Sequence, residues 1–248
     1  MKFFAQEIIT ASMNRCHSLT MKFCFVLCFI TISITPTRMI ASFVTQTYVT
    51  ESGSGLQNGT SWANAFSAAQ LQSAINLGVP QVWVAAGTYK PTTGSDRSIS
   101  FAMKNGVTIY GGFNGTETFL GQRNWNTNIT ILSGDIGTNL VSTDNSYHVV
   151  SNLNLNNTAI LDGFTIQGGC DNPASGNGLG AGILNLSSSP VIINCKIINN
   201  TVISIDAAAS GAALYNSVAI LLLAIALSKT TLSKHWICIR DADVPGMA

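Results

Sequence analysis

Charged residues are scarce in this chain of 248 residues. They make up 9% of it, against about 25% of an average soluble domain. Between Ser42 and Ser217 we count five basic and eight acidic residues, a net charge of −3. The basic residues are Lys90, Arg97, Lys104, Arg123 and Lys196; the acidic ones are Glu51, Asp96, Glu117, Asp135, Asp144, Asp162, Asp171 and Asp206. Because so few basic side chains cannot neutralise a row of phosphates, nucleic acid is excluded as a partner.

An apolar run long enough to span a membrane comfortably is also missing near the N-terminus. The run Phe23–Ile34 follows Arg15 and Lys22 and ends before Pro36, and it is shorter than the roughly 20 residues that a spanning helix needs. This pattern predicts a signal or export segment over residues 1–41. A membrane anchor and a buried core helix are the alternatives.

Few cysteines remain for a disulfide framework. Of six in the chain, three lie in or before the apolar run and Cys238 lies in the C-terminal tail, which leaves Cys170 and Cys195. An oxidising compartment would permit these two to pair. Because Cys195 belongs to an alternating apolar segment, we favour a buried free thiol over a disulfide.

One helix is predicted, over Ser67–Asn76. Ser67 and Gln70 have the spacing of a capping box, and Leu71, Ala74 and Ile75 form an apolar stripe. Short strands separated by turn residues are predicted elsewhere. They are Thr47–Thr50, Gln81–Ala85, Val107–Tyr110, Asn128–Leu132, His148–Ser151, Ala159–Ile166 and Val191–Ile198.

The last of these strands alternates strictly. Its pattern predicts that one face is apolar and buried. The residues expected to face inward are Val191, Ile193, Cys195 and Ile197, and those expected to face outward are Ile192, Asn194 and Lys196.

An internal repeat lies near the C-terminus. Gly180–Asn185 (GAGILN) aligns with Gly211–Asn216 (GAALYN) at an offset of 31 residues (211 − 180). The first copy continues as SSSPVIINCKIINN, whereas the second continues as the apolar run VAILLLAIALSKTT. A fixed period of this length is typical of repeat architectures.

The apolar continuation of the second copy suggests a frameshift. If the third base of each codon is joined to the first two bases of the next, and these free third bases are chosen as A, C or T, the codons for residues 218–231 can be read as SNPTISNCTFKNN. This string restores the proline, the Asn-Cys pair and the final Asn-Asn of the first copy. We therefore expect residues 218–248 not to be native sequence. A genuine apolar helix or a C-terminal membrane anchor is the alternative, although the run is about half as long as a span requires.

The body Tyr48–Ser217 resembles the right-handed parallel β-helix repeat proteins of bacterial surfaces. These are relatives of the pectate-lyase-like superfamily and of the polymorphic outer-membrane-protein repeats. Gly180–Ile183 is similar to their Gly-Gly-Ala-Ile motif, and Ile197–Asn200 to their Phe-x-x-Asn motif with isoleucine in place of phenylalanine. Further similar segments are NGTSWANAF, VWVAAGTYKP, VTIYGGFNGTE, ILSGDIG and ILDGFTIQGG.

The resemblance implies an all-β fold, a right-handed parallel β-helix over residues 48–217 with a short N-terminal capping helix. It is specific for fold and weak for function, because many activities share the scaffold. Enzymes of this type remove a proton beside a uronate carboxylate with Arg or Lys as the base, and often use Ca²⁺. The candidates for such a site are Lys104, Glu117, Arg123, Asp135, Asp144 and His148.

None of these candidates lies in a recognisable lyase motif. Asp135 and Asp162 lie at expected turns, where aspartate is common for conformational reasons. Arg123, Trp125 and Glu117 form an alternative candidate, a sugar-binding platform on which the indole would stack. Partial burial that pins a loop is the more frequent role of such a tryptophan. We assign no catalytic, cofactor-binding or metal-binding residue.

Two functions are therefore expected from the sequence. The first is a secreted or cell-surface adhesin or structural module that binds glycans without catalysis, monomeric and attached to a membrane only through its export signal or an outer-membrane anchor. The second is a polysaccharide lyase or glycoside hydrolase on the same scaffold. A carboxylate cluster beside a basic residue on one exposed strand face would favour the second.

Overall fold

The computed structural model describes residues 45–139, 141–173, 178–203, 211–217, 223–224 and 238–239. The chain divides into two units, Met1–Ser42 and Phe43–Ala248, and all described residues belong to the second. The expected export segment, residues 1–41, lies outside the described residues. So does the tail 218–248, apart from two short strands.

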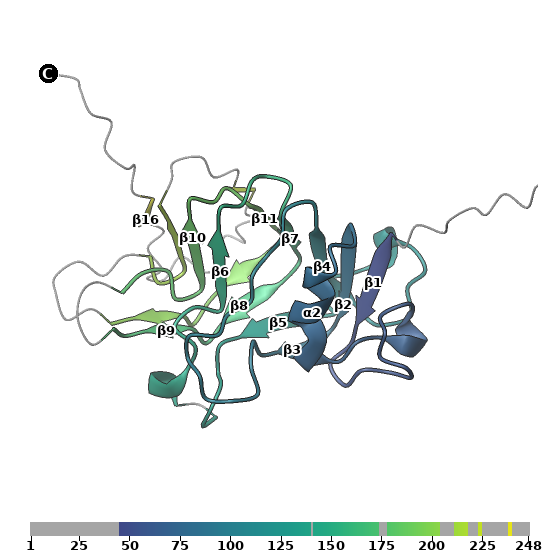
Figure 1. Cartoon of the computed structure of the whole chain (residues 1–248), viewed down its shortest axis with the longest axis horizontal. Coiled ribbons are helices and arrows are strands. Elements are labelled where there is room, and N and C mark those ends of the chain that lie inside the picture. Colours follow the sequence, from purple (N-terminus) through teal and green to yellow (C-terminus); the bar gives the residue numbers. More distant parts are fainter. Residues whose placement is uncertain are drawn as a thin grey trace, which may run out of the picture. The chain divides into compact units, whose positions relative to one another are not determined.

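Short strands make up most of the second unit (Figure 1). The six-stranded sheet contains, in spatial order, β1 (Gln46–Val49), β2 (Gln81–Ala85), β4 (Thr108–Phe113), β7 (Ile160–Asp162), β11 (Val191–Ile193) and β15 (Leu223–Ala224). The β3–β12 sheet contains β3 (Gly87–Tyr89), β5 (Thr130–Ser133), β8 (Thr165–Gln167) and β12 (Lys196–Ile197). The β6–β16 sheet contains β6 (Val150–Leu153), β10 (Ile183–Leu186), β14 (Leu214–Asn216) and β16 (Cys238–Ile239), and β9 (Cys170–Asp171) pairs with β13 (Thr201–Val202).

Helical segments in the described residues are few and short. They are the α-helix α2 (Leu71–Asn76) and the 3₁₀ turns η1 (Trp62–Asn64), η2 (Ala68–Gln70), η3 (Leu120–Gln122) and η4 (Ser142–Asp144). Every pairing between named strands is parallel. The architecture is therefore strand-based, with all-parallel sheets and few helices.

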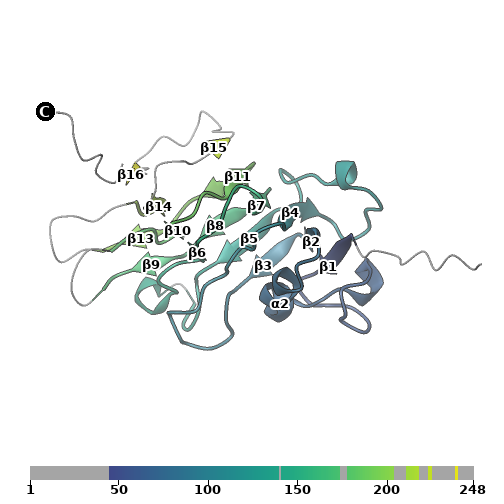
Figure 2. The same ribbon diagram turned by 45° about the horizontal axis from the view of Figure 1, so that its top comes forward.

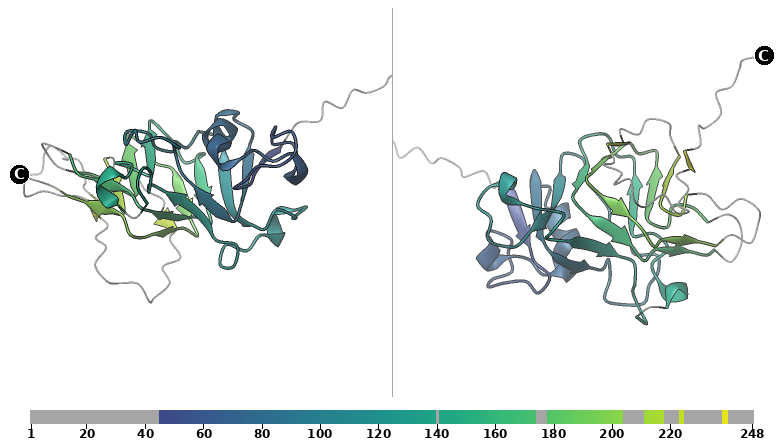
Figure 3. Two further views of the ribbon diagram at one scale, coloured as in Figure 1. Left: turned by 90° about the horizontal axis from the view of Figure 1, so that it is seen from below. Right: turned by 180° about the vertical axis from the view of Figure 1, so that it is seen from behind.

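The chain visits the sheets in the same order twice. After β7 it passes through β8, β9 and β10, and after β11 it passes through β12, β13 and β14 in the corresponding sheets. We call β7–β10 the first circuit and β11–β14 the second circuit. Their strands pair at an offset of 31 residues, as for Ile160 with Val191 (191 − 160). Figure 2 shows β5 beside β8, and Figure 3 shows the same ordering of colours along the sheets from below and from behind.

A row of inward side chains runs along the six-stranded sheet. Val82 on β2 pairs with Ile109 on β4, Ile109 with Leu161 on β7, and Leu161 with Ile192 on β11. Each of these side chains is at most 3% exposed. Because each apolar residue lies beside its counterpart on the next strand, neighbouring strands bury one another.

The predicted helix Ser67–Asn76 is confirmed as η2 followed by α2. The Ser67 N–H donates to Gln70 Oε1 at 3.0 Å, which forms the glutamine half of the expected capping box. The apolar stripe of α2 belongs to the hydrophobic core. Its members are Leu71, Ala74 and Ile75, each at most 2% exposed.

Two of the predicted strands are divided in the structure. Ala159–Ile166 forms β7 and β8, and Val191–Ile198 forms β11 and β12. The divisions occur at Gly163 and Asn194, which have φ values of +86° and +52°. This left-handed conformation turns the chain from the six-stranded sheet into the β3–β12 sheet, and glycine and asparagine are the residues that adopt it most readily.

The corner at Asn194 also explains a wrong prediction about the buried face. Ile192, expected to face outward, is fully buried, whereas Val191 and Ile193, expected inward, are partly exposed. Cys195 is buried as expected, at 6% exposure. A single period-2 pattern does not continue through a left-handed residue, so the alternation on β11 cannot be extended to Cys195.

The internal repeat is confirmed as a pair of neighbouring strands. Leu184 on β10 pairs with Tyr215 on β14, and Asn185 pairs with Asn216, in the alignment predicted from the sequence. On the other side of β10, Asn152 of β6 pairs with Asn185, so asparagine occupies the same position on three neighbouring strands. Both amides are at most 1% exposed, and Asn152 Nδ2 donates to Asn185 Oδ1 at 2.8 Å. The interior therefore contains an amide hydrogen bond between successive strands.

Candidate functional site

An aromatic cluster covers the outer face of the six-stranded sheet near its N-terminal edge. Trp83 on β2 stacks on Phe113 with ring centroids 4.7 Å apart and an interplanar angle of 13°. Tyr48 on β1 packs edge-on against Trp62, with centroids 4.8 Å apart. The Trp62 indole N–H donates to the carbonyl of Glu117 at 2.9 Å. This face is therefore an outer apolar layer, and Trp83 is only 3% exposed.

Next to this cluster, Arg123 forms a buried ion pair with Asp162 at the end of β7. Arg123 Nη2 lies 2.6 Å from Asp162 Oδ2, and the two side chains are 8% and 7% exposed. The guanidinium Cζ lies 4.9 Å from the ring centroid of Tyr110 and 4.6 Å from that of Trp125. Asn194 Nδ2 donates to the other carboxylate oxygen at 2.8 Å.

The surroundings of Arg123 therefore indicate an anchor. The ion pair attaches the segment 114–128 to the sheet, and both oxygens of Asp162 have donors. Removing either charge would leave the other buried without an opposite charge, which is costly. A guanidinium held in this way between two rings is not free to take a proton from a substrate.

Glu117 is engaged in its own loop. Its Oε1 accepts the Asn114 N–H at 2.7 Å, and its Oε2 accepts the N–H groups of Gly115 and Thr116 at 3.0 and 3.1 Å. The residue is 5% exposed. These three backbone bonds stabilise the turn after β4, and they account for this carboxylate without a ligand.

Lys104 lies on the surface beside the end of α2. Its ammonium donates to the carbonyl of Asn76 at 2.7 Å. A cation in this position satisfies one of the free carbonyls at a helix C-terminus. Lys104 therefore has a local structural role at the end of α2.

A second polar cluster surrounds Arg97, which the sequence did not single out. Arg97 Nε donates to the carbonyl of Asn145 at 2.6 Å, and Nη2 donates to the carbonyl of Cys170 at 2.8 Å and to the amide oxygen of Asn172. The guanidinium Cζ lies 4.2 Å from the ring centroid of Tyr147. Arg97 thus joins three segments that are remote in sequence.

His148 and Asp171 lie in the same neighbourhood. His148 Nδ1 lies 3.1 Å from the carbonyl of Gly180, and Asp171 Oδ2 accepts the Leu179 N–H at 2.6 Å. Burial lowers the pKa of His148 from its ordinary value, opposed by the charge of Asp171 and by the bond to Gly180. The neutral imidazole is therefore favoured in the folded chain.

The turn from Gly134 to Ser146, which we call the Gly134–Ser146 turn, contains four buried side-chain oxygens that have no hydrogen-bond partner among the described residues. They are Asp135 Oδ1, Asp144 Oδ1, Asn145 Oδ1 and Ser146 Oγ. Asp144 uses its other oxygen to accept the Thr138 N–H at 2.8 Å. The sequence candidates Asp135, Asp144 and His148 thus lie in one region, apart from Glu117 and Arg123.

Both body cysteines are free and buried, which confirms the interpretation preferred from the sequence. Burial raises the pKa of the Cys195 thiol to about 12. It also raises the pKa of Cys170. Thiols in such surroundings stay protonated and are poor nucleophiles.

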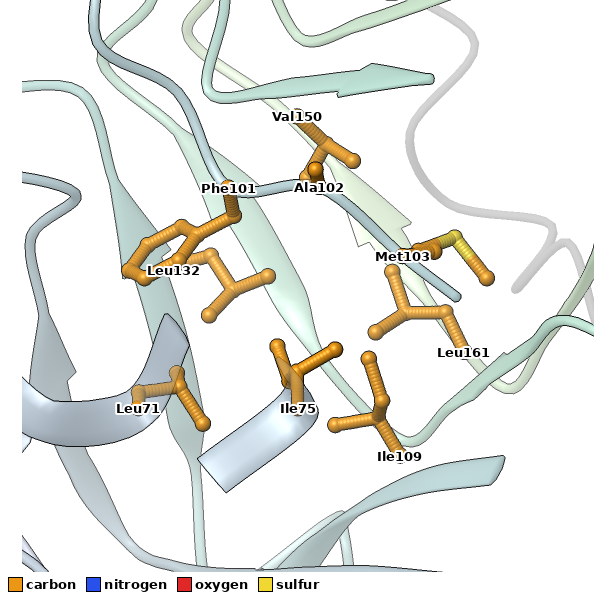
Figure 4. Close-up of a pocket in the computed structure, with 9 residues that line it drawn as sticks. All are labelled: Leu71, Ile75, Phe101, Ala102, Met103, Ile109, Leu132, Val150 and Leu161. Carbon is orange, nitrogen blue, oxygen red and sulfur yellow. The ribbon is translucent and has the colours of Figure 1, made fainter. Parts of the chain in front are cut away.

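A small cavity lies in the core beneath α2 (Figure 4). Leu71 and Ile75 point into it from the helix, and Phe101 and Met103 close it from the segment that precedes β4. Every lining residue is apolar; the others are Ala102, Ile109, Leu132, Val150 and Leu161. A site without a polar group cannot orient a sugar or a charged substrate, so this cavity is a packing feature of the core.

Within the described ranges, no three His, Cys, Asp or Glu side chains gather where they could hold a metal ion. In the same part of the chain, no helix has both the length and the apolar character needed to cross a membrane. Comparison with protein-family models, with curated proteins and with solved structures finds no match to this chain.

Proposed function

We propose that this chain is a right-handed parallel β-helix of an exported protein. The parallel pairing of β7, β8, β9 and β10 with β11, β12, β13 and β14 supports this fold. A connection between parallel strands is right-handed in about 98% of known cases. The apolar stripe of α2 lies in the core beside the first strands, in keeping with a capping helix. Export rests on the leader pattern of residues 1–41.

The protein's activity, in this proposal, is non-catalytic binding or structural support at the cell surface or outside the cell. One observation carries it: three of the candidate catalytic residues are engaged by the fold, and the oxygens of Asp135 and Asp144 that lack a hydrogen-bond partner among the described residues are buried. Arg123 is paired with Asp162, Glu117 accepts three backbone N–H groups, and Lys104 donates to a helix end. A general base needs a free lone pair within reach of a substrate proton, and none of these groups offers one.

The ligand class is a cell-surface or extracellular polysaccharide. Trp125 is half-buried with its ring held against Arg123, so it presents an immobilised indole face at the outer side of the six-stranded sheet. Fixed aromatic rings suit the apolar faces of sugar rings because little side-chain freedom is lost on binding. Phe119, in the same loop, is 60% exposed, and among the described residues no cation lies over its ring as Arg123 lies over that of Trp125.

Binding to an array of acidic and neutral polysaccharides tests this function. The proposal expects retention by at least one polysaccharide, lost in Trp125→Ala and kept in Phe119→Ala, with both variants showing the parent circular dichroism spectrum. Phe119 is the matched control because it is an exposed aromatic residue of the same loop. Loss in Phe119→Ala alone would show that the platform is wrongly placed, and no retention at all would remove the binding function.

Turnover would distinguish the alternative, a lyase or hydrolase. The chain is incubated with the acidic polysaccharides while the absorbance of an unsaturated product and the release of reducing ends are followed. Turnover that disappears in Lys104→Ala or Arg123→Ala would overturn the non-catalytic proposal. The Arg123 variant is read only beside a spectrum that shows it is folded, since that side chain is buried.

A further inference from the structure

The second circuit has open edges within the described residues. β12 is the last strand of its sheet and β13 the last of its pair, and no described strand lies on their far sides. The N–H groups of Lys196 and Thr201 both donate back to the first circuit, to Phe164 and Gly169 at 2.8 Å. A parallel strand can form backbone hydrogen bonds along both of its edges. The far edges of β12 and β13 can therefore each pair with a following strand.

The two circuits share a pattern of left-handed corners that any following circuit must repeat. Gly163 and Asn194 form the first corner, with φ of +86° and +52°, and Gly168 and Asn199 form the second, with φ of +77° and +53°. Each pair is separated by 31 residues (194 − 163 and 199 − 168). The next corners therefore fall at positions 225 and 230.

The printed sequence does not suit these corner positions. It has Ile225 and Thr230 there, and β-branched residues are the least tolerant of a left-handed backbone. The shifted reading SNPTISNCTFKNN, in which one base of each codon is chosen, allows asparagine at both positions when it is aligned at the same offset. Its cysteine falls at the position of Ala226, which corresponds to buried Cys195, and its phenylalanine at that of Ser228, which corresponds to Ile197.

A buried asparagine gives a further match. Asn200 is 6% exposed; its Oδ1 accepts the Gly169 N–H at 2.9 Å, and its Nδ2 donates to the carbonyls of Ile166 and Ile198 at 3.0 Å. The shifted reading allows asparagine one offset later, at the position of Thr231. There its amide oxygen would accept the Asn200 N–H in the same way, a bond that threonine is too short to copy.

We infer that the edges of β12 and β13 are the docking surface for a third circuit, and that the occupant is the segment encoded by the shifted frame of codons 218–231. The corners at Asn194 and Asn199 and the amide bridge of Asn200 specify the residues that this segment must carry. Burial of the open edges removes unpaired backbone groups that would otherwise template aggregation. The inference depends on the arrangement of the circuits and not on glycan binding.

Hydrogen exchange tests this inference in three full-length chains. They are the printed chain, a restored chain in which residues 219–231 are replaced by SNPTISNCTFKNN, and a control with the same 13 replacing residues in an order that moves asparagine away from positions 225, 230 and 231. The observable is the exchange rate of backbone amides in peptides covering residues 195–203. The restored chain is expected to exchange at least tenfold more slowly than both others.

Equal exchange in the printed and restored chains would overturn the inference, as would equal slowing by the reordered control. A restored chain that aggregates more than the printed chain in sedimentation would also count against it. Sequencing the gene across the codons for Tyr215 to Thr231 gives an independent check. One added or missing base is expected, and a confirmed frame would reject this occupant for the edge.

Discussion

Two polar regions of the molecule satisfy their buried groups differently. On the outer face of the six-stranded sheet, both oxygens of Asp162 have donors, from Arg123 and Asn194. In the Gly134–Ser146 turn, four buried oxygens have no partner among the described residues. The first region fixes a loop to the sheet, whereas the second carries the cost of unpaired polar atoms.

The difference shows which buried polar groups are not used by hydrogen bonds within the fold. A buried group whose bonds are complete contributes to one structure and cannot also serve a ligand. Unpaired oxygens in a native fold are few and call for an explanation. The turn that contains Asp135 and Asp144 therefore gathers four polar atoms that the fold does not use, whereas Thr50 Oγ1 and Asn185 Nδ2 are single cases elsewhere in the described chain.

The largest effect is expected from breaking the ion pair. Arg123→Met leaves Asp162 charged and buried, so we expect the free energy of unfolding to fall by about 3–5 kcal/mol. Urea unfolding followed by circular dichroism measures the change. Arg97→Met is the matched control, since Arg97 is half-buried and bonds only neutral acceptors; an equal loss there would show that the buried charge pair has no special weight.

A smaller loss is expected at Asn194. Asn194→Gly keeps a residue that accepts the left-handed corner but removes the donor to Asp162, and a hydrogen bond to a charged group contributes about 1.5–3 kcal/mol. Gly163 already occupies the equivalent corner in the first circuit. The urea midpoint measures this as well, and an unchanged midpoint would mean that Asp162 needs only Arg123.

A substitution in the Gly134–Ser146 turn is not expected to lower the free energy of unfolding, unlike the two substitutions above. Ser146 is fully buried and its Oγ has no hydrogen-bond partner among the described residues. Removing an unpaired hydroxyl recovers part of its desolvation cost, so Ser146→Ala should leave stability unchanged or raise it by about 1 kcal/mol. A loss of stability above about 1 kcal/mol would reveal that the hydroxyl has a hydrogen-bond partner. Both regions would then satisfy their buried polar groups.

The smallest effect concerns pH. Burial lowers the folded-state pKa of His148 below its ordinary 6.5, so the unfolded chain takes up the proton first as the pH falls. The stability due to neutral His148 is complete above about pH 6.5 and is lost as the pH falls through the folded-state pKa. We expect the urea midpoint to drop between pH 7 and pH 5, and to drop less in His148→Gln. Parallel curves for the two proteins would contradict this.

Several features could be predicted from the sequence because they depend on local patterns. Gln81–Ala85 was predicted as a strand with the bounds that β2 has, and the capping box and apolar stripe located the helix. The 31-residue repeat predicted the register of β10 and β14. Such signals survive because turn residues and periodic apolar positions act over a few residues.

Other features could not be predicted because they join distant segments. Arg123 and Asp162 are 39 residues apart, and Arg97 meets Asn145, Cys170 and Asn172 across still longer separations. No local pattern marks such partners. The inward face of β11 was missed for a related reason: the corner at Asn194 interrupts an alternation that looks continuous in the sequence.

The sequence alone determined the strand-rich character, the repeat and the helix, because spacing and side-chain type decide local conformation. Only the tertiary structure decided which face of β11 is buried and which charged residues the fold consumes. Those outcomes depend on where the left-handed corners turn the chain. The stacking of one circuit on the next then decides whether a carboxylate such as Asp162 meets a cation, a backbone donor or neither.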